Sequence, residues 1–139
     1  MLELDVRVRT RAGQERVWTV LSNSQTWAEW APFDEIAVES GHQLGEVRRV
    51  RSGPITTRER VVGFEPPHRY VYEIISGLPV RHYLAEVVLT PSAGAGTDIR
   101  WRAQFEPTLP GTGWLVKLLL SSAIKRAARA LAARADALS

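Results

Sequence analysis

The 139-residue sequence has no cysteine. A disulfide framework, a thiol nucleophile and a cysteine-ligated metal are therefore all excluded. The three histidines, His42, His68 and His82, do not show the spacing of a metal site. A glycine-rich phosphate loop is missing too, and no nucleophile and base are paired by their spacing. We therefore expect neither a metal nor a nucleotide cofactor.

Long apolar runs are also missing, so no integral membrane segment is expected. Acids stand at Glu3 and Asp5, where a secretory signal would need basic and then apolar residues, which favours a cytoplasmic location. The formal net charge is +3, but the basic residues are mixed with acids, as where Arg58 and Arg60 flank Glu59. This mixing is typical of solvated strand faces, so no nucleic-acid partner is expected.

Proline and glycine are absent from residues 114–138, which are rich in alanine, leucine, lysine and arginine. At about 100° per residue the apolar residues fall on one broad arc, with Lys125, Arg129 and Asp136 opposite and Leu118 as an exception. The arc consists of Val116, Leu119, Leu120, Ala123, Ile124, Ala127, Ala130, Leu131 and Leu138. We predict one amphipathic helix over residues 111–137 that must be covered by a sheet.

The residues before this helix predict strands and two short helices. Alternating apolar and charged residues from Leu2 to Arg9 indicate a half-buried first strand, and short helices are predicted over residues 14–21 and 25–30. Six strands follow, predicted over Asp34–Ser40, Glu46–Arg51, Ile55–Phe64, Arg69–Ile75, Val80–Thr90 and Thr97–Glu106. Their short turns favour antiparallel hairpins. The expected fold is one α+β domain over residues 1–139, a seven-stranded antiparallel sheet wrapped around the C-terminal helix.

The turns also predict which residues face one another. If Gly53-Pro54 is a two-residue hairpin loop, Arg48 lies opposite Glu59. If Gly77-Leu78 is the next such loop, Tyr72 lies opposite Tyr83. Strand alternation then places an apolar set on the inner face of the sheet. That set includes Tyr70, Tyr72, Ile74, Tyr83, Ala85, Val87, Leu89, Ile99, Trp101, Ala103 and Phe105.

Six short motifs follow one another in a distinctive order. They are Val17-Trp18-Thr19-Val20-Leu21-Ser22, Trp27-Ala28-Glu29-Trp30, Gly45-Glu46-Val47-Arg48, Arg58-Glu59-Arg60-Val61, Tyr70-Val71-Tyr72 and Gly96-Thr97-Asp98-Ile99-Arg100-Trp101. With this order the whole chain resembles the START-like helix-grip superfamily (SRPBCC), and within it the bacterial polyketide cyclase/dehydrase and lipid-transport family. The resemblance implies a cavity between sheet and long helix for sterols, lipids, polyketides or hormones. Members include cyclases, carriers, receptors and cochaperone-like proteins, so no single activity is implied.

Two loops resemble those of plant abscisic-acid receptors in the same superfamily. Ser52-Gly53-Pro54 corresponds to a gate loop, and Gly77-Leu78-Pro79 begins the segment that corresponds to a latch. The first loop is shorter here than a closing gate.

Arg48 and Glu59 are the first candidates for chemistry. If both point inward, Arg48 would bind or polarise a carbonyl or carboxylate, while Glu59 would orient it or move a proton. The alternative is a structural ion pair, buried or exposed, and this interpretation is slightly favoured.

Aromatic side chains are the candidates for binding a ligand. Tyr72 and Tyr83 would orient an oxygenated molecule, with Tyr83 also a candidate catalytic residue. The remaining candidates for the wall of the cavity are Trp27, Trp101, Trp114 and Val87. The alternative is that the tyrosines and Trp101 only fill the core.

The resulting prediction is a protein that binds a small hydrophobic, partly oxygenated ligand, as a monomer or homodimer. It would be a polyketide cyclase or dehydrase, or else a non-catalytic lipid or isoprenoid carrier or ligand sensor. A third hypothesis is a cochaperone-like interaction module that uses its surface.

Overall fold

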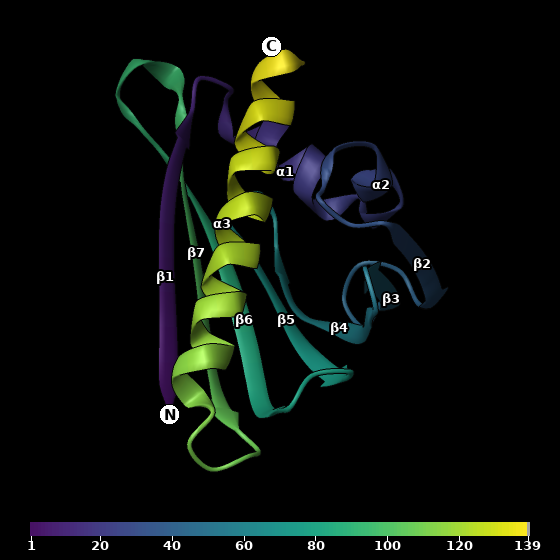
Figure 1. Ribbon diagram of the computed structural model, residues 1–139. Helices are drawn as coiled ribbons and strands as arrows, with labels where there is room; N and C mark the ends of the chain where they lie inside the picture. Colours follow the sequence, from purple (N-terminus) through teal and green to yellow (C-terminus); the bar gives the residue numbers. More distant parts are fainter. Residues whose placement is uncertain (139) are drawn as a thin grey trace.

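The computed structural model describes residues 1–138 and contains every predicted helix and strand (Figure 1). The elements are β1 (Leu2–Thr10), α1 (Gln14–Ser22), the 3-10 turn η1 (Ser24–Thr26), α2 (Trp27–Trp30), β2 (Glu35–Ser40), β3 (Val47–Ser52), β4 (Ile55–Glu65), β5 (Arg69–Ser76), β6 (Val80–Pro91), η2 (Ala93–Ala95), β7 (Thr97–Pro107) and α3 (Gly113–Ala137). The second predicted short helix begins as the 3-10 turn η1 and continues as α2.

The seven strands form one antiparallel sheet in the order β1-β7-β6-β5-β4-β3-β2. The first and last strands pair with each other, and β1 forms one edge of the sheet. Helix α3 crosses the inner face of the sheet over β1 and β7 (Figure 1). Helix α1 packs against α3 and β6, and α2 packs against β2. This is the predicted helix-grip architecture. No helix among residues 1–138 is long and apolar enough to cross a membrane.

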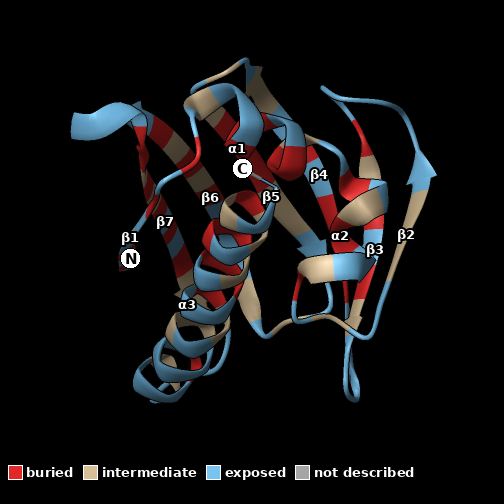
Figure 2. Ribbon diagram, turned by 90° about the horizontal axis from the view of Figure 1, so that it is seen from above, coloured by how far each residue is buried: buried red, intermediate tan, exposed pale blue. Residues whose placement is uncertain are grey.

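The inner face of the sheet and the facing side of α3 form one core (Figure 2). The predicted inward positions of β6 and β7 are confirmed, because Tyr83, Ala85, Val87 and Leu89 are buried. So are the inward residues of β7, which are Ile99, Trp101, Ala103 and Phe105.

Most of the predicted register is confirmed. Arg48 lies opposite Glu59, and Val87 lies opposite Trp101. The pairing of Tyr72 with Tyr83 is wrong, since Tyr72 lies opposite Ala85. The β5–β6 connection is not a simple two-residue hairpin: His82 has a positive φ of 55°, and the β6–β7 register shifts between Arg81 and Leu84.

The error in register amounts to two residues, from position 83 to position 85, which keeps every side chain on its predicted face. Tyr72 and Tyr83 are therefore diagonal neighbours on the inner face, with ring centroids 6.4 Å apart.

Three predictions for α3 are wrong. Leu119 and Leu138, predicted for the apolar arc, are 60% and 45% exposed. Asp136, predicted to face solvent, accepts hydrogen bonds from the Thr10 hydroxyl at 2.5 Å and the Arg11 amide at 2.8 Å. The buried residues of the helix lie mainly in its second half. Near its two ends, a helical wheel alone therefore does not predict which side chains are buried.

Candidate functional site

A cluster of buried polar residues occupies the inner face where β3, β4 and β5 meet η1 and α2. Strand β3 supplies Arg48, and the turn before it supplies Glu46. Strands β4 and β5 supply Glu59 and Tyr70, and η1 supplies Ser24. All five residues are buried, and we call them the Arg48 cluster.

Arg48 is the centre of this cluster and has no solvent exposure. Its Nε donates to Glu59 Oε1 at 3.0 Å. Its Nη1 donates to the Tyr70 hydroxyl, to Ser24 Oγ at 3.3 Å and to Glu46 Oε2 at 3.5 Å. Ser24 in turn donates to Glu46 Oε2 at 2.6 Å. The cluster therefore links the helical segment to three strands.

The third guanidinium nitrogen of Arg48 is used differently. Nη2 lies 2.9 Å from Glu59 Oε1, close enough for an ion pair, yet it makes no well-directed hydrogen bond within residues 1–138. The face of the guanidinium lies over the Trp27 ring, 4.2 Å from its centroid, in a cation–π contact. The Arg48 guanidinium thus makes hydrogen bonds along its edge and a cation–π contact on its face, while Nη2 lacks a well-directed hydrogen bond.

Burial by itself would lower the pKa of Arg48, but the neighbouring Tyr70 and Glu59 outweigh burial and raise this pKa. Arg48 is therefore a permanent cation. Its two carboxylate neighbours, Glu46 and Glu59, exceed it in number, so the cluster has no surplus of positive charge for an anionic ligand.

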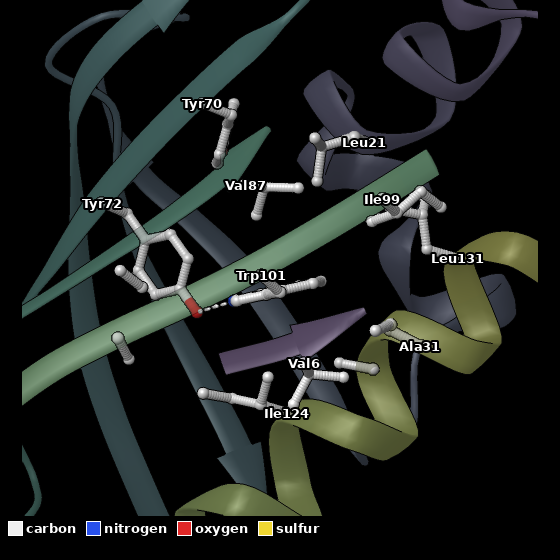
Figure 3. Close-up of a cluster of buried hydrophobic side chains, with 14 of the residues drawn as sticks. Val6, Leu21, Ala31, Tyr70, Tyr72, Val87, Ile99, Trp101, Ile124 and Leu131 are labelled. Carbon is white, nitrogen blue, oxygen red and sulfur yellow. Dashed lines mark hydrogen bonds between the residues drawn. The ribbon is translucent and has the colours of Figure 1, made fainter. Parts of the chain in front are cut away.

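A row of aromatic side chains with hydrogen-bonding groups lies beside this cluster on β5, β6 and β7. Figure 3 shows two of them, Tyr72 and Trp101, joined by a hydrogen bond. The indole nitrogen of Trp101 donates to the Tyr72 hydroxyl at 3.3 Å. The rings of Tyr72 and Tyr83 lie next to each other, with centroids 6.4 Å apart. The ring of Tyr83 stacks on Phe105 with centroids 6.1 Å apart. The row therefore presents polar hydroxyl and indole N–H groups next to apolar ring surfaces.

The phenols in this row remain protonated at neutral pH. Burial, followed by the nearby Glu59 charge, raises the pKa of Tyr72. Burial, followed by Tyr72 and Glu59, raises the pKa of Tyr83 well above its ordinary value. Burial also raises the pKa of Tyr70, against the opposing effect of Arg48. These tyrosines are hydrogen-bond donors and weak acids rather than bases.

Most of the predicted site residues come together. Trp27 contacts Arg48, while Tyr72, Tyr83, Trp101 and Val87 share the core behind it. Trp114 is the exception, because it is 71% exposed on the outward side of α3. The prediction that Trp114 belongs to the wall of an interior cavity is wrong, since the first turn of the helix extends past the core.

Sequence reasoning missed Ser24, Glu46 and Tyr70 as partners of Arg48. Glu46 stands two positions before Arg48, so strand alternation could have placed it on the same face. Tyr70 was predicted inward without a partner. Ser24 belongs to η1, and no periodicity of the sequence shows which strand that turn touches.

The cavity between sheet and helix remains a prediction. The side chains expected to line it are packed against one another, with Tyr72, Tyr83, Val87 and Trp101 at most 6% exposed. Two hollows of about 680 and 490 Å³ involve the charged outer face and edge of the sheet instead, and neither includes the Arg48 cluster. In the described chain no group of three or more histidine, aspartate and glutamate residues is arranged to hold a metal.

Comparison with known proteins agrees with this geometry. The family model described as polyketide cyclase/dehydrase and lipid transport matches residues 1–138. The chain belongs to this family. The comparison with curated proteins gave no match.

Solved structures show how widely this fold is used. A START superfamily protein from Mycobacterium smegmatis is 17% identical with a TM-score of 0.82, covering 99% of both chains. A protein from Thermobifida fusca is 21% identical with a TM-score of 0.84, covering 100% of this chain and 96% of the other. A norcoclaurine synthase mutant from Thalictrum, bound to a transition-state analogue, is 16% identical with a TM-score of 0.81, covering 96% of this chain and 93% of the other. At these identities the likeness establishes the family's fold and leaves its chemistry open.

Proposed function

We propose that this family member binds a small hydrophobic, partly oxygenated molecule between the inner face of its sheet and α3. The observation behind the proposal is a set of neighbouring buried polar groups in an otherwise apolar interior: Arg48 and Glu59 lie beside Tyr72, which adjoins Tyr83 and Trp101. Buried polar groups are costly unless they are paired. A row of donors beside apolar rings suits a ligand with a carbonyl or hydroxyl on a hydrophobic frame.

Ligand entry would require α3 to move. Between Gly113 and Ile124 only Val116 and Ile124 are buried, so the first half of the helix is weakly held. The second half packs through Ala127, Ala128, Leu131, Ala132 and Ala135. Lifting the first half would open the interior near Tyr83 and leave the Arg48 cluster in place.

The catalytic form of this proposal is an aldol-type cyclisation or dehydration of a polyketide. Glu59 would take a proton from the carbon next to a ligand carbonyl. The protonated Tyr72 and Tyr83 would donate hydrogen bonds to the oxygen on which negative charge develops. Arg48, held by its protein partners, would position the Glu59 carboxylate.

A carrier or sensor is the second candidate, and a specific contact pattern favours it. Two nitrogens of Arg48 donate all their hydrogen bonds to protein groups, namely Glu59, Tyr70, Ser24 and Glu46. Such a pattern is expected if the cluster only stabilises the fold. Binding would then depend on the tyrosine row alone. No turnover would accompany it.

Both the catalyst and the carrier must bind a ligand, and native mass spectrometry of the protein as purified tests this binding. We expect a retained small molecule, which solvent extraction then identifies. Binding of the extracted compound should weaken by about 0.5–1.5 kcal/mol in Tyr72→Phe, which removes one hydroxyl. The matched control is Trp114→Phe, whose side chain lies outside the core and should leave affinity unchanged. Equal affinity of Tyr72→Phe and the wild type would place the ligand elsewhere.

Glu59→Gln separates the catalyst from the carrier. The amide keeps the size of the side chain and removes the carboxylate base. If Glu59 is the base, turnover of the extracted compound or its precursor should fall by two to four orders of magnitude, roughly, while affinity changes little. Turnover that persists unchanged would return Glu59 to a structural role.

A further inference from the structure

The outward face of α3 changes character along its length. Its first turns expose Trp114, Leu115, Leu118 and Leu119, which are 71%, 43%, 61% and 60% accessible. Leu109, in the loop before the helix, is 56% exposed. Figure 2 shows these first turns extending away from the buried core. Single exposed apolar residues are ordinary, but a cluster containing tryptophan indicates an interaction site.

The same outward arc is cationic further along the helix. At about 100° per residue, Ser122, Lys125, Arg126 and Arg129 continue the arc that Trp114 and its neighbours begin, and all four are exposed. From residue 107 to residue 135 the sequence contains no acid. The same stretch contains five basic residues, which are Lys117, Lys125, Arg126, Arg129 and Arg134.

These cations differ from those of the sheet. Arginines on the outer face are paired with acids, for example Arg102 with Glu86 at 2.6 Å and Arg100 with Asp5 at 2.8 Å. On α3, Arg134 pairs with Glu29 at 3.6 Å. Across residues 1–138 the other four basic residues of the helix form no ion pair with an acid. Their charge is therefore available to a partner.

We propose that this outward face of α3, with the loop at Leu109, docks the protein on an anionic membrane surface. Tryptophan and leucine side chains partition into the region between headgroups and acyl chains, and nearby lysines and arginines reach the anionic headgroups. A second copy of this chain fits less well, because the same face offers no acid to balance the cations. An anionic bilayer supplies both the apolar layer and the opposite charge.

This inference is independent of the ligand proposed above. Docking uses residues on the outside of α3, whereas the proposed ligand contacts the inner face. The helix whose first half would lift for ligand entry is the one in contact with the membrane. A failure of membrane docking would therefore leave the ligand experiments unaffected.

Flotation with phospholipid vesicles tests the proposal on the full chain. We expect the protein to float with vesicles of phosphatidylcholine and phosphatidylglycerol and to remain unbound with phosphatidylcholine alone. Trp18, Trp27 and Trp101 are at most 8% exposed, and Trp30 on α2 is partly buried against the core. Trp114, which is 71% exposed, is therefore the tryptophan that should respond most to lipid. Its fluorescence should be quenched by brominated acyl chains only when the vesicles are anionic.

Matched variants locate the contact. Leu118→Glu should reduce partitioning by roughly tenfold or more, since it removes a leucine that would enter the apolar layer of the membrane and adds an acid. The control is Leu44→Glu, which has nearly the same exposure, 62% against 61%, on another part of the surface. Lys125→Gln and Arg126→Gln should each reduce partitioning about fivefold. Added salt should also weaken partitioning, because it screens the attraction between these cations and the headgroups.

Three results would overturn the inference. One is the absence of binding to anionic vesicles, and another is equal binding by Leu118→Glu and Leu44→Glu. The third is a lipid-free dimer, seen by sedimentation, that shields Trp114 from acrylamide and dissociates in Leu118→Glu. That outcome would assign the face to a second copy of the chain.

Discussion

Arg48 is the residue on which the inner polar cluster depends. It has no solvent exposure and contacts groups from η1, α2, β4 and β5. A charge in such a place is tolerated because its hydrogen bonds and ion pairs replace the lost water. Removing it would leave Glu59 and Glu46 buried without their cation.

We therefore predict that Arg48→Ala lowers the free energy of unfolding by about 3–5 kcal/mol. Urea unfolding followed by circular dichroism measures this change. The control is Arg102→Ala, which breaks a 2.6 Å pair with Glu86 whose arginine side chain is 47% exposed. That loss should be about 0–1 kcal/mol. Similar losses in the two variants would mean that the Arg48 cluster contributes little to stability.

At the scale of elements, the turn between β5 and β6 begins at a glycine that lies directly against β4. Gly77 ends β5 with φ +107°, and a Cβ atom there would lie 2.1 Å from the Thr56 carbonyl oxygen on β4. Backbone contact of this kind admits only glycine. The close approach holds the end of β5 against β4.

We expect Gly77→Ala to be far more damaging than Gly53→Ala. Gly53 also has a positive φ, +59°, but a Cβ atom there would meet nothing within 4 Å. Gly53→Ala should cost about 1–2 kcal/mol from backbone strain alone. Gly77→Ala adds a backbone clash and should cost about 1–3 kcal/mol more. Thermal unfolding of both variants checks the difference, and equal melting temperatures would show that β5 has room to shift.

At the scale of the whole molecule, the last helix is tied to the first strand. Asp136 near the end of α3 accepts hydrogen bonds from Thr10 and Arg11 at the end of β1. The Thr10 hydroxyl, followed by the Arg11 amide, lowers the pKa of Asp136 below its ordinary value. One carboxylate thus ties the last turn of α3 to the end of β1.

This contact predicts a pH dependence. Because the pKa of Asp136 is lower in the folded chain than in the unfolded one, its contribution to stability is present at neutral pH. The contribution should be lost as the pH falls below about 4 and the carboxylate is protonated. The difference in unfolding free energy between wild type and Asp136→Asn should therefore shrink in acid. Urea unfolding across this pH range measures it, and a difference that does not change with pH would contradict the assigned role.

The sequence by itself determined the layers of this protein. Alternation along the strands and a helical stretch free of proline and glycine were enough to predict the sheet, its inner face and α3. A short turn at Gly53-Pro54 was enough to bring Arg48 opposite Glu59. These features depend on periods of two and 3.6 residues and on local turn chemistry, which can be read from neighbouring residues.

Only the tertiary structure decided the rest, because those features depend on contacts between distant segments. It placed Ser24 of η1 on Arg48, moved the partner of Tyr72 from Tyr83 to Ala85, and turned Asp136 toward Thr10. It also left the first turns of α3 beyond the core, with Trp114 in solvent. A helical wheel shows which residues share a face, whereas the length of helix that the sheet can cover is set by where the strands end.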